Sequence, residues 1–315
     1  MATTECDLII GIGTRFDDRV TGKLSTFAPH ADIIHIDIDP GAIARNVPVK
    51  IPIVGDARQI LEELFPILEA PDIDEWRKEM LTLKKDFPLP EGEKGENLIP
   101  QQVVKVISEV FPEAIITTEV GQNQMFGALY YTYTKPRTFL TSGGLGTMGY
   151  GFPAAIGAQL GNRDKKVIDI AGDGSIQMNI QELGTAVQEG LPVIVAILNN
   201  GYLGMVRQWQ QIFKGKRYSA TCLMRKPGCP HDCAGKTGTW CHHYLVDFIK
   251  LAEAYGAIGM RVDKEEDVKP ALIEAGKSKN VPVLIDFIIQ RESNVFPMVP
   301  PGVGINEMYL TEGDW

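Results

Sequence analysis

The sequence lacks several features that would assign a protein of 315 residues to a common class. Basic residues are not in surplus, because 31 Lys and Arg face 40 Asp and Glu, and the net charge of −9 does not favour nucleic-acid binding. No segment reaches the roughly 18 continuous apolar residues that a membrane-spanning helix needs. The opening MATTECDLIIGIG has neither the basic start nor the cleavage site of a signal peptide. We therefore expect a soluble, cytoplasmic protein without nucleic-acid or membrane partners.

Cysteine is scarce as well, with five residues, yet four of them lie in one short segment. These four are Cys222, Cys229, Cys233 and Cys241. Thiolates in a loop rich in Pro and Gly can close around a tetrahedral Zn²⁺ or hold an iron–sulfur cluster. The intervals match no standard CxxC pair, so disulfides and free thiols remain alternatives, and a cytoplasmic setting disfavours disulfides.

Apolar residues, in contrast, are plentiful and form unbroken runs. The hydrophobic content of 44% allows a sizeable core, and the length favours two domains. Runs bounded by turn residues predict buried parallel strands. They are AIITTEVG (114–121), KVIDIAGDG (166–174), LPVIVAILNN (191–200) and PVLIDFII (282–289). Because PQQVVKVISEVF (100–111) has helical spacing, the pattern favours an α/β fold with helices on both faces of a parallel sheet.

The first part of the chain has the order of a nucleotide-binding unit. DLIIGIG (7–13) predicts a strand that enters a glycine turn, and DIIHIDID (32–39) predicts the next strand. A strand, a glycine turn, a helix and a strand ending in acidic residues are typical of such units. Gly11 and Gly13 fit the dinucleotide fingerprint, but Phe16 occupies the position of its third glycine. An ordinary strand–turn–helix connection therefore remains an alternative.

A short acidic turn follows one of the predicted strands in the second part. Asp173 stands between Gly172 and Gly174, so the backbone can turn sharply and approach a ligand closely. The following segment predicts a helix with Asn179 as its N-cap and Gly190 at its end. Asp173 is therefore expected between the end of a strand and a helix.

The next predicted strand also ends in polar residues, Asn199 and Asn200. Two consecutive parallel strands end at the same edge of a sheet, and open α/β sheets bind ligands there. A carboxylate oxygen from Asp173 and an amide oxygen from Asn200 are hard ligands that suit Mg²⁺ together with phosphates of a ligand. A helix cap by Asp173 and an ordinary turn at Asn200 are the structural alternatives.

The interval of 27 residues from Asp173 to Asn200 completes a longer pattern. GDG followed at this distance by NN resembles the thiamine diphosphate-binding motif of thiamine-dependent enzymes. Further segments resemble the large subunit of acetolactate synthase (acetohydroxyacid synthase), over nearly the whole chain except residues 220–243. These segments are FDDRVTGKL, HIDIDP, VGQNQM, TSGGLGTMGYGFPAAIGA, NNGYLGMVRQWQ and NVFPMVPPG.

The resemblance implies that the chain binds thiamine diphosphate through Mg²⁺. The metal would be held by Asp173, Asn200 and the backbone carbonyl of Tyr202. Met148 would wedge under the cofactor and force its bent shape, with core packing as the alternative. The residues implied to bind the cofactor are Gly121, Gln122, Asn123, Gly146, Met148, Gly172, Asp173, Gly174, Ser175, Asn200 and Tyr202. The family more often has His at the position of Asn123.

The implied reaction is a transfer of a two-carbon unit. Pyruvate would be decarboxylated and the unit joined to a second 2-oxo acid, pyruvate or 2-oxobutanoate, in branched-chain amino-acid synthesis. Met205, Val206 and Trp209 would shape the pocket for this second acid, unless they form a buried helical stripe. Trp209 would favour 2-oxobutanoate through its extra methylene, a discrimination worth about 1–3 kcal/mol. Another thiamine-dependent carboligase or decarboxylase is the alternative enzyme.

The resemblance also assigns the first part of the chain to a flavin-binding segment in which FAD has a structural role. FAD contacts are implied for Gly13, Arg15, Asp17, Arg19, Val20, Asp37 and Asp56. The implied organisation has four parts. They are part of a Rossmann-like flavin-binding domain (1–70), a connecting helix and linker (71–97), a doubly wound parallel-sheet diphosphate-binding domain (98–290) with the Cys-rich insert (220–243), and an active-site tail (291–315).

Members of this family also carry a pyrimidine-binding domain with a glutamate that activates the cofactor, and no segment here resembles it. We therefore expect a carboxyl-terminal piece, either a truncation or one half of a split subunit. A homodimer or a partner chain would supply the pyrimidine-binding domain, and a small regulatory subunit is a further implied partner. Alone, the chain would bind the cofactor weakly and form no acetolactate. A non-catalytic cofactor-binding subunit is the alternative from a different class.

Overall fold

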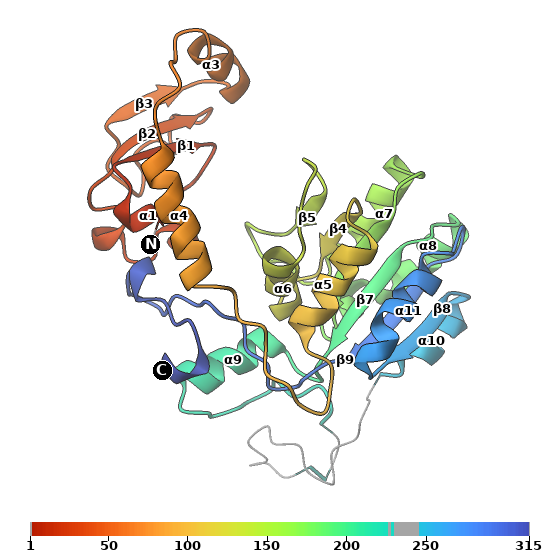
Figure 1. The fold of residues 1–315 in the computed structure, drawn as a ribbon. Helices are drawn as coiled ribbons and strands as arrows, with labels where there is room; N and C mark the ends of the chain where they lie inside the picture. Colours follow the sequence, from red (N-terminus) through yellow and green to blue (C-terminus); the bar gives the residue numbers. More distant parts are fainter. Residues whose placement is uncertain (1, 226–227, 230–245, 315) are drawn as a thin grey trace. The chain divides into compact units, whose positions relative to one another are not determined.

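The computed structural model describes residues 2–225, 228–229 and 246–314, and its helices and strands are shown in Figure 1. The chain divides into two compact units. The first comprises Met1–Pro90 and Phe296–Trp315, and the second comprises Glu91–Val295. Among the helices of the described residues, none combines the length and the apolar character needed to cross a membrane.

The first unit contains a parallel three-stranded sheet in the order β1-β2-β3. Its elements are β1 (Leu8–Ile12), β2 (Asp32–Asp37), β3 (Ile51–Val54), α1 (Ala2–Glu5), α2 (Asp18–Thr21), α3 (Ala57–Leu64), α4 (Asp74–Asp86) and the 3-10 helices η1 (Leu24–Thr26), η3 (Ile305–Glu307) and η4 (Glu312–Asp314). The strands predicted over 7–13 and 32–39 are present. The glycine turn after β1 leads to the four residues of α2, which is shorter than the helix expected of a nucleotide-binding unit.

The side chain of Phe16 explains why the dinucleotide fingerprint is incomplete. Its ring is buried and packs edge-on against the rings of Phe27 and His35, with centroid distances of 6.0 and 5.0 Å. A side chain at Gly11 would overlap the ring of Phe16. Phe16 therefore belongs to the core of the first unit, and Gly11 leaves room for it.

The second unit is built on a six-stranded parallel sheet in the order β5-β4-β6-β7-β9-β8. Its strands are β4 (Ile115–Thr118), β5 (Phe139–Thr141), β6 (Val167–Gly172), β7 (Ile194–Asn199), β8 (Ile258–Val262) and β9 (Val283–Ile288). Its helices are α5 (Pro100–Val110), α6 (Gln122–Tyr130), α7 (Gly151–Gly161), α8 (Leu183–Gln188), α9 (Gly204–Phe213), α10 (Phe248–Tyr255), α11 (Glu265–Ala275) and the 3-10 helix η2 (Ile176–Glu182).

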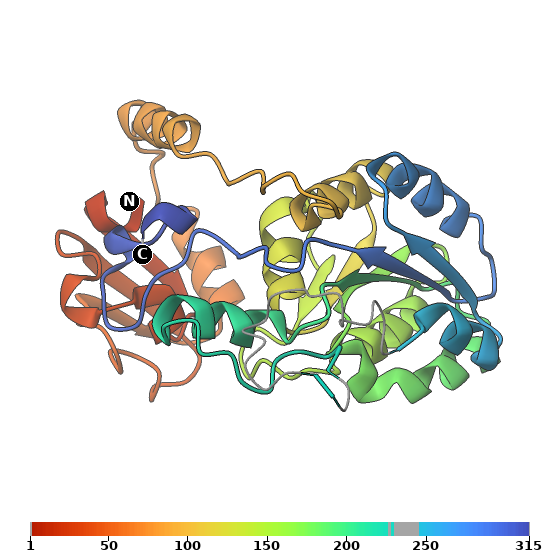
Figure 2. The ribbon, with the colours of Figure 1, turned by 90° about the horizontal axis from the view of Figure 1, so that it is seen from below.

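Helices cover both faces of this sheet, as Figure 2 shows. Alternate residues of each strand enter two separate cores, because successive side chains of a strand point to opposite faces. Ile194 and Ala196 of β7 pack with residues of α5, α6 and α11. Val195 and Ile197 pack with residues of α7, α8 and α10. The predicted α/β fold with a doubly wound parallel sheet is confirmed.

The segment after β6 differs in part from the prediction. A 3-10 helix, η2, precedes α8, and Asn179 lies inside η2 with non-helical angles of φ −134° and ψ 34°. The Nδ2 of Asn179 donates a hydrogen bond to the carbonyl of Gly149 at 2.6 Å, which keeps Asn179 in this kink rather than at a helix N-cap. The predicted N-cap is therefore wrong. Gly190 follows the end of α8 with a φ of +61°, as predicted.

Candidate functional site

Strands β6 and β7 bring polar residues to one edge of the six-stranded sheet. The two strands pair in parallel, with Gly172 opposite Leu198. Asp173 and Asn200 therefore follow strand ends at the same carboxyl edge, where open α/β sheets bind their ligands. The edge predicted for these two residues is the one observed.

A cavity of about 300 Å³ lies at this edge. Every residue predicted to bind thiamine diphosphate or Mg²⁺ lines it, together with two residues of the predicted substrate pocket. These are Gly121, Gln122, Asn123, Gly146, Met148, Gly172, Asp173, Gly174, Ser175, Asn200, Tyr202, Met205 and Val206. Segments far apart in the sequence, from the end of β4 to the start of α9, thus contribute to one cavity.

The carboxylate of Asp173 is buried at this cavity, with 5% of the residue exposed. Its Oδ2 accepts a hydrogen bond from the backbone N–H of Gly201 at 3.0 Å. Burial raises the pKa of Asp173 to about 7, and the nearby carboxylate of Asp286 also raises it, while main-chain N–H donors lower it. A bound cation would stabilise the ionised carboxylate, so the environment of Asp173 suits a metal ligand.

The side-chain amide of Asn200 is held in one orientation. Its Oδ1 accepts a hydrogen bond from the backbone N–H of Tyr202 at 2.9 Å, and its Nδ2 donates to Oε1 of Gln122 at 3.2 Å. Gln122 in turn donates through Nε2 to Oε1 of Gln208 and to the carbonyl of Ser293, both at 2.9 Å. The amide oxygen of Asn200 therefore faces the turn, and an amide oxygen carries a second lone pair for a further ligand.

Asn123 has a different arrangement from the one that a phosphate donor needs. Its Nδ2 donates to the backbone carbonyls of Glu119 and Ile170, at 2.9 and 2.8 Å. Both hydrogens of the amide group are then used within the protein. A hydrogen bond from Asn123 to the diphosphate stays a prediction, and it would require the amide group to turn.

The loop that carries Met148 is fixed by a buried acid that was not predicted. Glu119 has no exposed surface and follows β4. One of its oxygens accepts from the N–H of Gly149 at 2.6 Å, and the other accepts from the N–H of Phe152 at 3.0 Å. Glu119 therefore connects the end of β4 to the loop beside Met148 and to the start of α7.

The three residues of the predicted substrate pocket lie on α9, but they differ in position. Met205 and Val206 line the cavity, and Val206 is about half exposed. Trp209 is not among the residues that line the cavity within the described part of the chain. Its ring packs edge-on against Phe213, with 5.0 Å between the ring centroids. A role for Trp209 in substrate choice stays a prediction.

The residues predicted to contact FAD lie in the first unit. Gly13 follows β1 with a φ of +61°, and Asp37 ends β2, so both lie at the carboxyl edge of the three-stranded sheet. Asp56 follows β3 and caps α3 by accepting from the N–H groups of Arg58 and Gln59. Arg15 and Asp17 lie on the turn after β1 and form an ion pair of 2.6 Å. Arg19 and Val20 lie on α2.

The cysteine segment lies largely outside the described residues. Cys233 and Cys241 fall within residues 230–245, whereas Cys222 and Cys229 are described and half-buried. Cys222 forms an antiparallel backbone bridge with Tyr202. Within residues 2–225, 228–229 and 246–314, no three His, Cys, Asp or Glu side chains form a group that could hold a metal. The magnesium set predicted here has one carboxylate and does not require such a group.

Comparison with protein families shows which family the chain belongs to. The family description "Thiamine pyrophosphate enzyme, C-terminal TPP binding domain" matches residues 119–287, a range that contains all the residues described as lining the cavity except Ile289. The chain belongs to the thiamine pyrophosphate enzyme family. Thiamine pyrophosphate and thiamine diphosphate are the same cofactor, so the predicted cofactor is supported. A second description, the central domain of thiamine pyrophosphate enzymes, matches residues 1–64.

Curated relatives of this chain include acetolactate synthase large subunits. That of Corynebacterium glutamicum is 47% identical over 99% of this chain and 49% of the relative. The probable large subunit of Methanocaldococcus jannaschii is 44% identical over 96% of this chain and 49% of the relative. Isozyme 3 of Escherichia coli is 39% identical over 99% of this chain and 53% of the relative. The predicted resemblance is confirmed, and the chain spans about half the length of the curated relatives it matches.

Three residues in or near the cavity were not predicted from the sequence. Glu119 follows the strand end in TTEVG, and an acid at that place could have indicated a role at the sheet edge. Gly204 lines the cavity, and a side chain there would overlap the side chains of Gln122 and Asn200. Asp286 lies inside the apolar run PVLIDFII, where a lone acid signals a buried partner.

Proposed function

We propose that this chain is the thiamine diphosphate-binding part of an acetolactate synthase. The proposed reaction decarboxylates pyruvate and joins the two-carbon unit to a second 2-oxo acid, pyruvate or 2-oxobutanoate. The observation that carries the proposal is the cavity of the second unit, because residues predicted to bind the cofactor and Mg²⁺ line it together. The similarity to acetolactate synthase large subunits supports the choice of reaction within the family.

In this proposal Mg²⁺ binds Asp173, Asn200 and the backbone carbonyl of Tyr202. The residues fit the ion chemically, because a carboxylate and two neutral oxygens leave positions for diphosphate oxygens, as Mg²⁺ prefers. Burial disfavours the ionised form of Asp173 and raises its pKa, and a bound cation would stabilise that ionised form, which supports this assignment. Gly172, Gly174 and Ser175 would present backbone N–H groups to the diphosphate.

When bound, thiamine diphosphate supplies the carbon nucleophile for cleavage and formation of the bonds next to the carbonyl carbon. The protein residues bind and orient the reactants. Met148 would support the bent cofactor from below, and Glu119 holds the loop that carries Met148. Met205 and Val206 would contact the second 2-oxo acid, with Trp209 favouring 2-oxobutanoate.

Several further parts of the proposal follow from the resemblance. FAD would bind in the first unit at Gly13, Arg15, Asp17, Arg19, Val20, Asp37 and Asp56. A second copy or a partner chain would supply the pyrimidine-binding domain, a small regulatory subunit would be a further partner, and the protein would be cytoplasmic. For the segment with Cys222, Cys229, Cys233 and Cys241, stoichiometric zinc or iron in the purified protein would support a bound metal, and its absence would leave disulfides or free thiols.

A product assay tests the proposed reaction. The chain is mixed with the part of the Corynebacterium glutamicum relative that it does not match, and thiamine diphosphate, Mg²⁺ and pyruvate are added, with or without 2-oxobutanoate. The products are identified by NMR. We expect 2-acetolactate, and 2-aceto-2-hydroxybutanoate when 2-oxobutanoate is present, both dependent on the cofactor. Acetaldehyde as the sole product would contradict carboligation. No turnover in a mixture that binds the cofactor would favour a non-catalytic subunit.

A further inference from the structure

The backbone N–H of Gly201 lies between two side-chain acceptors. It is 3.0 Å from Oδ2 of Asp173 and 3.2 Å from Oδ1 of Asn199. Gly201 also has a φ of +70°, a backbone conformation that favours glycine. The turn that follows β7 is therefore oriented by Asn199 on one side, while it orients the carboxylate of Asp173 on the other.

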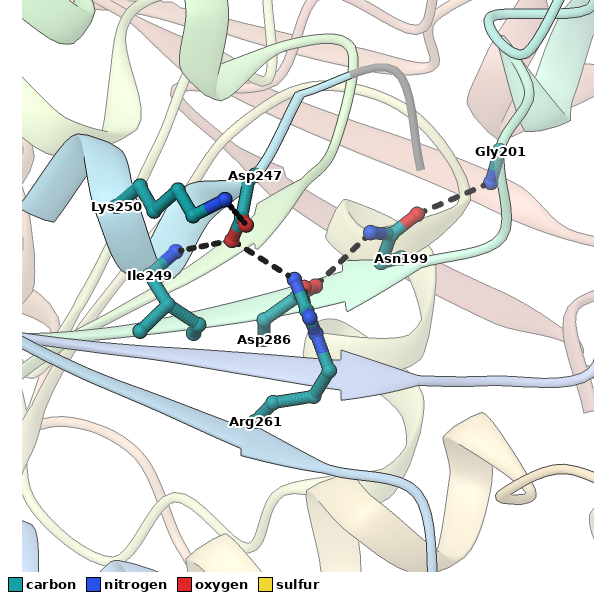
Figure 3. A network of polar contacts seen from close by, with 7 residues as sticks. All are labelled: Asn199, Gly201, Asp247, Ile249, Lys250, Arg261 and Asp286. Atoms are coloured by element: carbon teal, nitrogen blue, oxygen red, sulfur yellow. Dashed lines mark hydrogen bonds and ion pairs between the residues drawn. The ribbon is translucent and has the colours of Figure 1, made fainter. Parts of the chain in front are cut away.

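The amide group of Asn199 can face Gly201 in one orientation only, and Asp286 determines which. Figure 3 shows the Nδ2 of Asn199 directed at Asp286 on the neighbouring strand β9, and the Nδ2···Oδ1 distance is 2.9 Å. A carboxylate accepts and does not donate, so the NH₂ group of Asn199 must point to Asp286. The oxygen of Asn199 is then left to accept from Gly201. If the amide flipped, two donors would face each other at Gly201.

Arg261 fixes the carboxylate of Asp286 in turn. Asp286 has no exposed surface, and its Oδ2 accepts from Nε of Arg261 at 3.1 Å. Arg261 lies opposite Asp286 in the register of β8 and β9. The Nη2 of Arg261 donates to Oδ1 of Asp247 at 3.2 Å, and the same oxygen accepts from the N–H of Ile249 at the start of α10. These contacts form one continuous chain to Gly201 (Figure 3).

We propose that Asp286 and Arg261 are positioning residues for the divalent cation of the thiamine diphosphate site. They act through Asn199, whose oriented amide holds the Gly201 turn between the two side-chain ligands of the cation. The inference rests on the proposed function, because it takes Asp173 and Asn200 to be those ligands. Neither Asp286 nor Arg261 lines the cavity described here, so their effect is on geometry rather than by contact with the cofactor.

The binding of Mn²⁺ to the full chain, measured by electron paramagnetic resonance with saturating thiamine diphosphate, tests this proposal without an activity assay. Asp286→Asn keeps the shape of the side chain but lets Asn199 flip. We expect Mn²⁺ to bind about tenfold more weakly, the usual size of an effect from residues behind metal ligands. Asp169→Asn is the matched control, because Asp169 is equally buried in the same sheet but bonds to Thr117, and it should change the affinity less than about twofold.

A double-mutant cycle separates positioning from a general loss of structure. If Asp286 acts through Asn199, Asn199→Ala weakens Mn²⁺ binding, and adding Asp286→Asn to it causes no further loss. Arg261→Gln is a second variant at a position that tolerates change better, because 26% of the Arg261 side chain is exposed. It should weaken binding in the same direction when binding is measured well below the melting temperature of the variant.

The possible results separate this inference from the proposed function. If the wild-type chain binds Mn²⁺ but Asp286→Asn and Arg261→Gln bind it equally well, the positioning role is wrong and the proposed function stands. Losses that multiply in the double variant also overturn the positioning role. If the wild-type chain with thiamine diphosphate does not bind Mn²⁺, both the proposed function and this inference are wrong.

Discussion

Asp169 and Glu119 are two fully buried carboxyl groups near the paired strands β6 and β4. Burial raises the pKa of Asp169 well above its ordinary value, and the nearby Glu119 raises it further, while the hydroxyl of Thr117 lowers it. Burial also raises the pKa of Glu119, against the N–H donors of residues 149–152 that lower it. Because Glu119 accepts main-chain hydrogen bonds on both oxygens, Asp169 is the group that we expect to hold a proton.

The raised pKa of Asp169 predicts a pH dependence of stability. A carboxyl group whose pKa is higher in the folded than in the unfolded state stabilises the fold below the unfolded pKa, and this contribution is lost as pH rises through the folded pKa. Asp169→Asn removes the titration and resembles the protonated form. Between pH 5 and pH 8, the free energy of unfolding of the wild type should decrease. The decrease for Asp169→Asn should be smaller by at least about 1 kcal/mol, and urea unfolding at both pH values measures the two decreases. An equal fall in both proteins would contradict this prediction.

Two glycines of the second unit make a matched pair. Gly204 lines the cavity, and a side chain there would overlap Gln122 and Asn200, whereas one at Gly157 in α7 would meet nothing within 4 Å. Gly204→Ala should therefore weaken thiamine diphosphate binding about tenfold or more, the cost of overpacking a fixed site. Gly157→Ala should leave binding unchanged and raise the free energy of unfolding by about 1 kcal/mol, because alanine favours the helix. Calorimetric titration and urea unfolding check both, and equal binding by the two variants would contradict the account.

At the scale of helices and strands, the sequence predicted those elements whose pattern is simple. Strands β4, β6, β7 and β9 were found because residues buried on both faces give continuous apolar runs. Strands β3, β5 and β8 were missed. β3 contains Pro52, β5 has three residues, and β8 contains Gly259 and the charged Arg261, so their sequences do not resemble buried strands. Their places in the sheets come from pairing with neighbours.

In the candidate site, too, some features could be predicted from the sequence and others could not. Asp173 and Asn200 could be predicted because each follows a strand, and their interval is a known motif. The contact of Asn199 with Asp286 joins residues 87 positions apart, and nothing in either local sequence indicates the other. The N-cap predicted at Asn179 was wrong because the side chain bonds to Gly149, a tertiary contact that outweighs the local preference.

Glu119 stabilises both the loop beside Met148 and the start of α7, because it accepts hydrogen bonds from main-chain N–H groups of each. Glu119→Ala would leave the buried N–H groups of Gly149 and Phe152 without their acceptor, at a cost of about 3 kcal/mol in the free energy of unfolding. Glu113→Ala is the control on the same segment, because Glu113 is exposed and forms a surface ion pair of 3.6 Å with Lys135. Its effect should be below about 1 kcal/mol. Urea unfolding measures both, and similar losses would contradict the role of Glu119.

At the scale of the whole molecule, the division into two units agrees with the two family matches. The central-domain match falls within the first unit and the C-terminal match within the second. The cavity is lined by residues from Val120 to Ile289, and the two cores that flank the six-stranded sheet also lie inside the second unit. The described residues that line the proposed diphosphate site thus all belong to the second unit.

The central claim is that Asp173 and Asn200 attach thiamine diphosphate to the sheet edge through Mg²⁺. Calorimetric titration of the chain with thiamine diphosphate, with Mg²⁺ or with a chelator, tests this claim most directly. We predict that binding requires Mg²⁺, is lost in Asp173→Asn, and is unchanged in Asp164→Asn, which alters an exposed carboxylate of the same unit. Equal affinity with and without Mg²⁺, or in Asp173→Asn and the wild type, would contradict the claim.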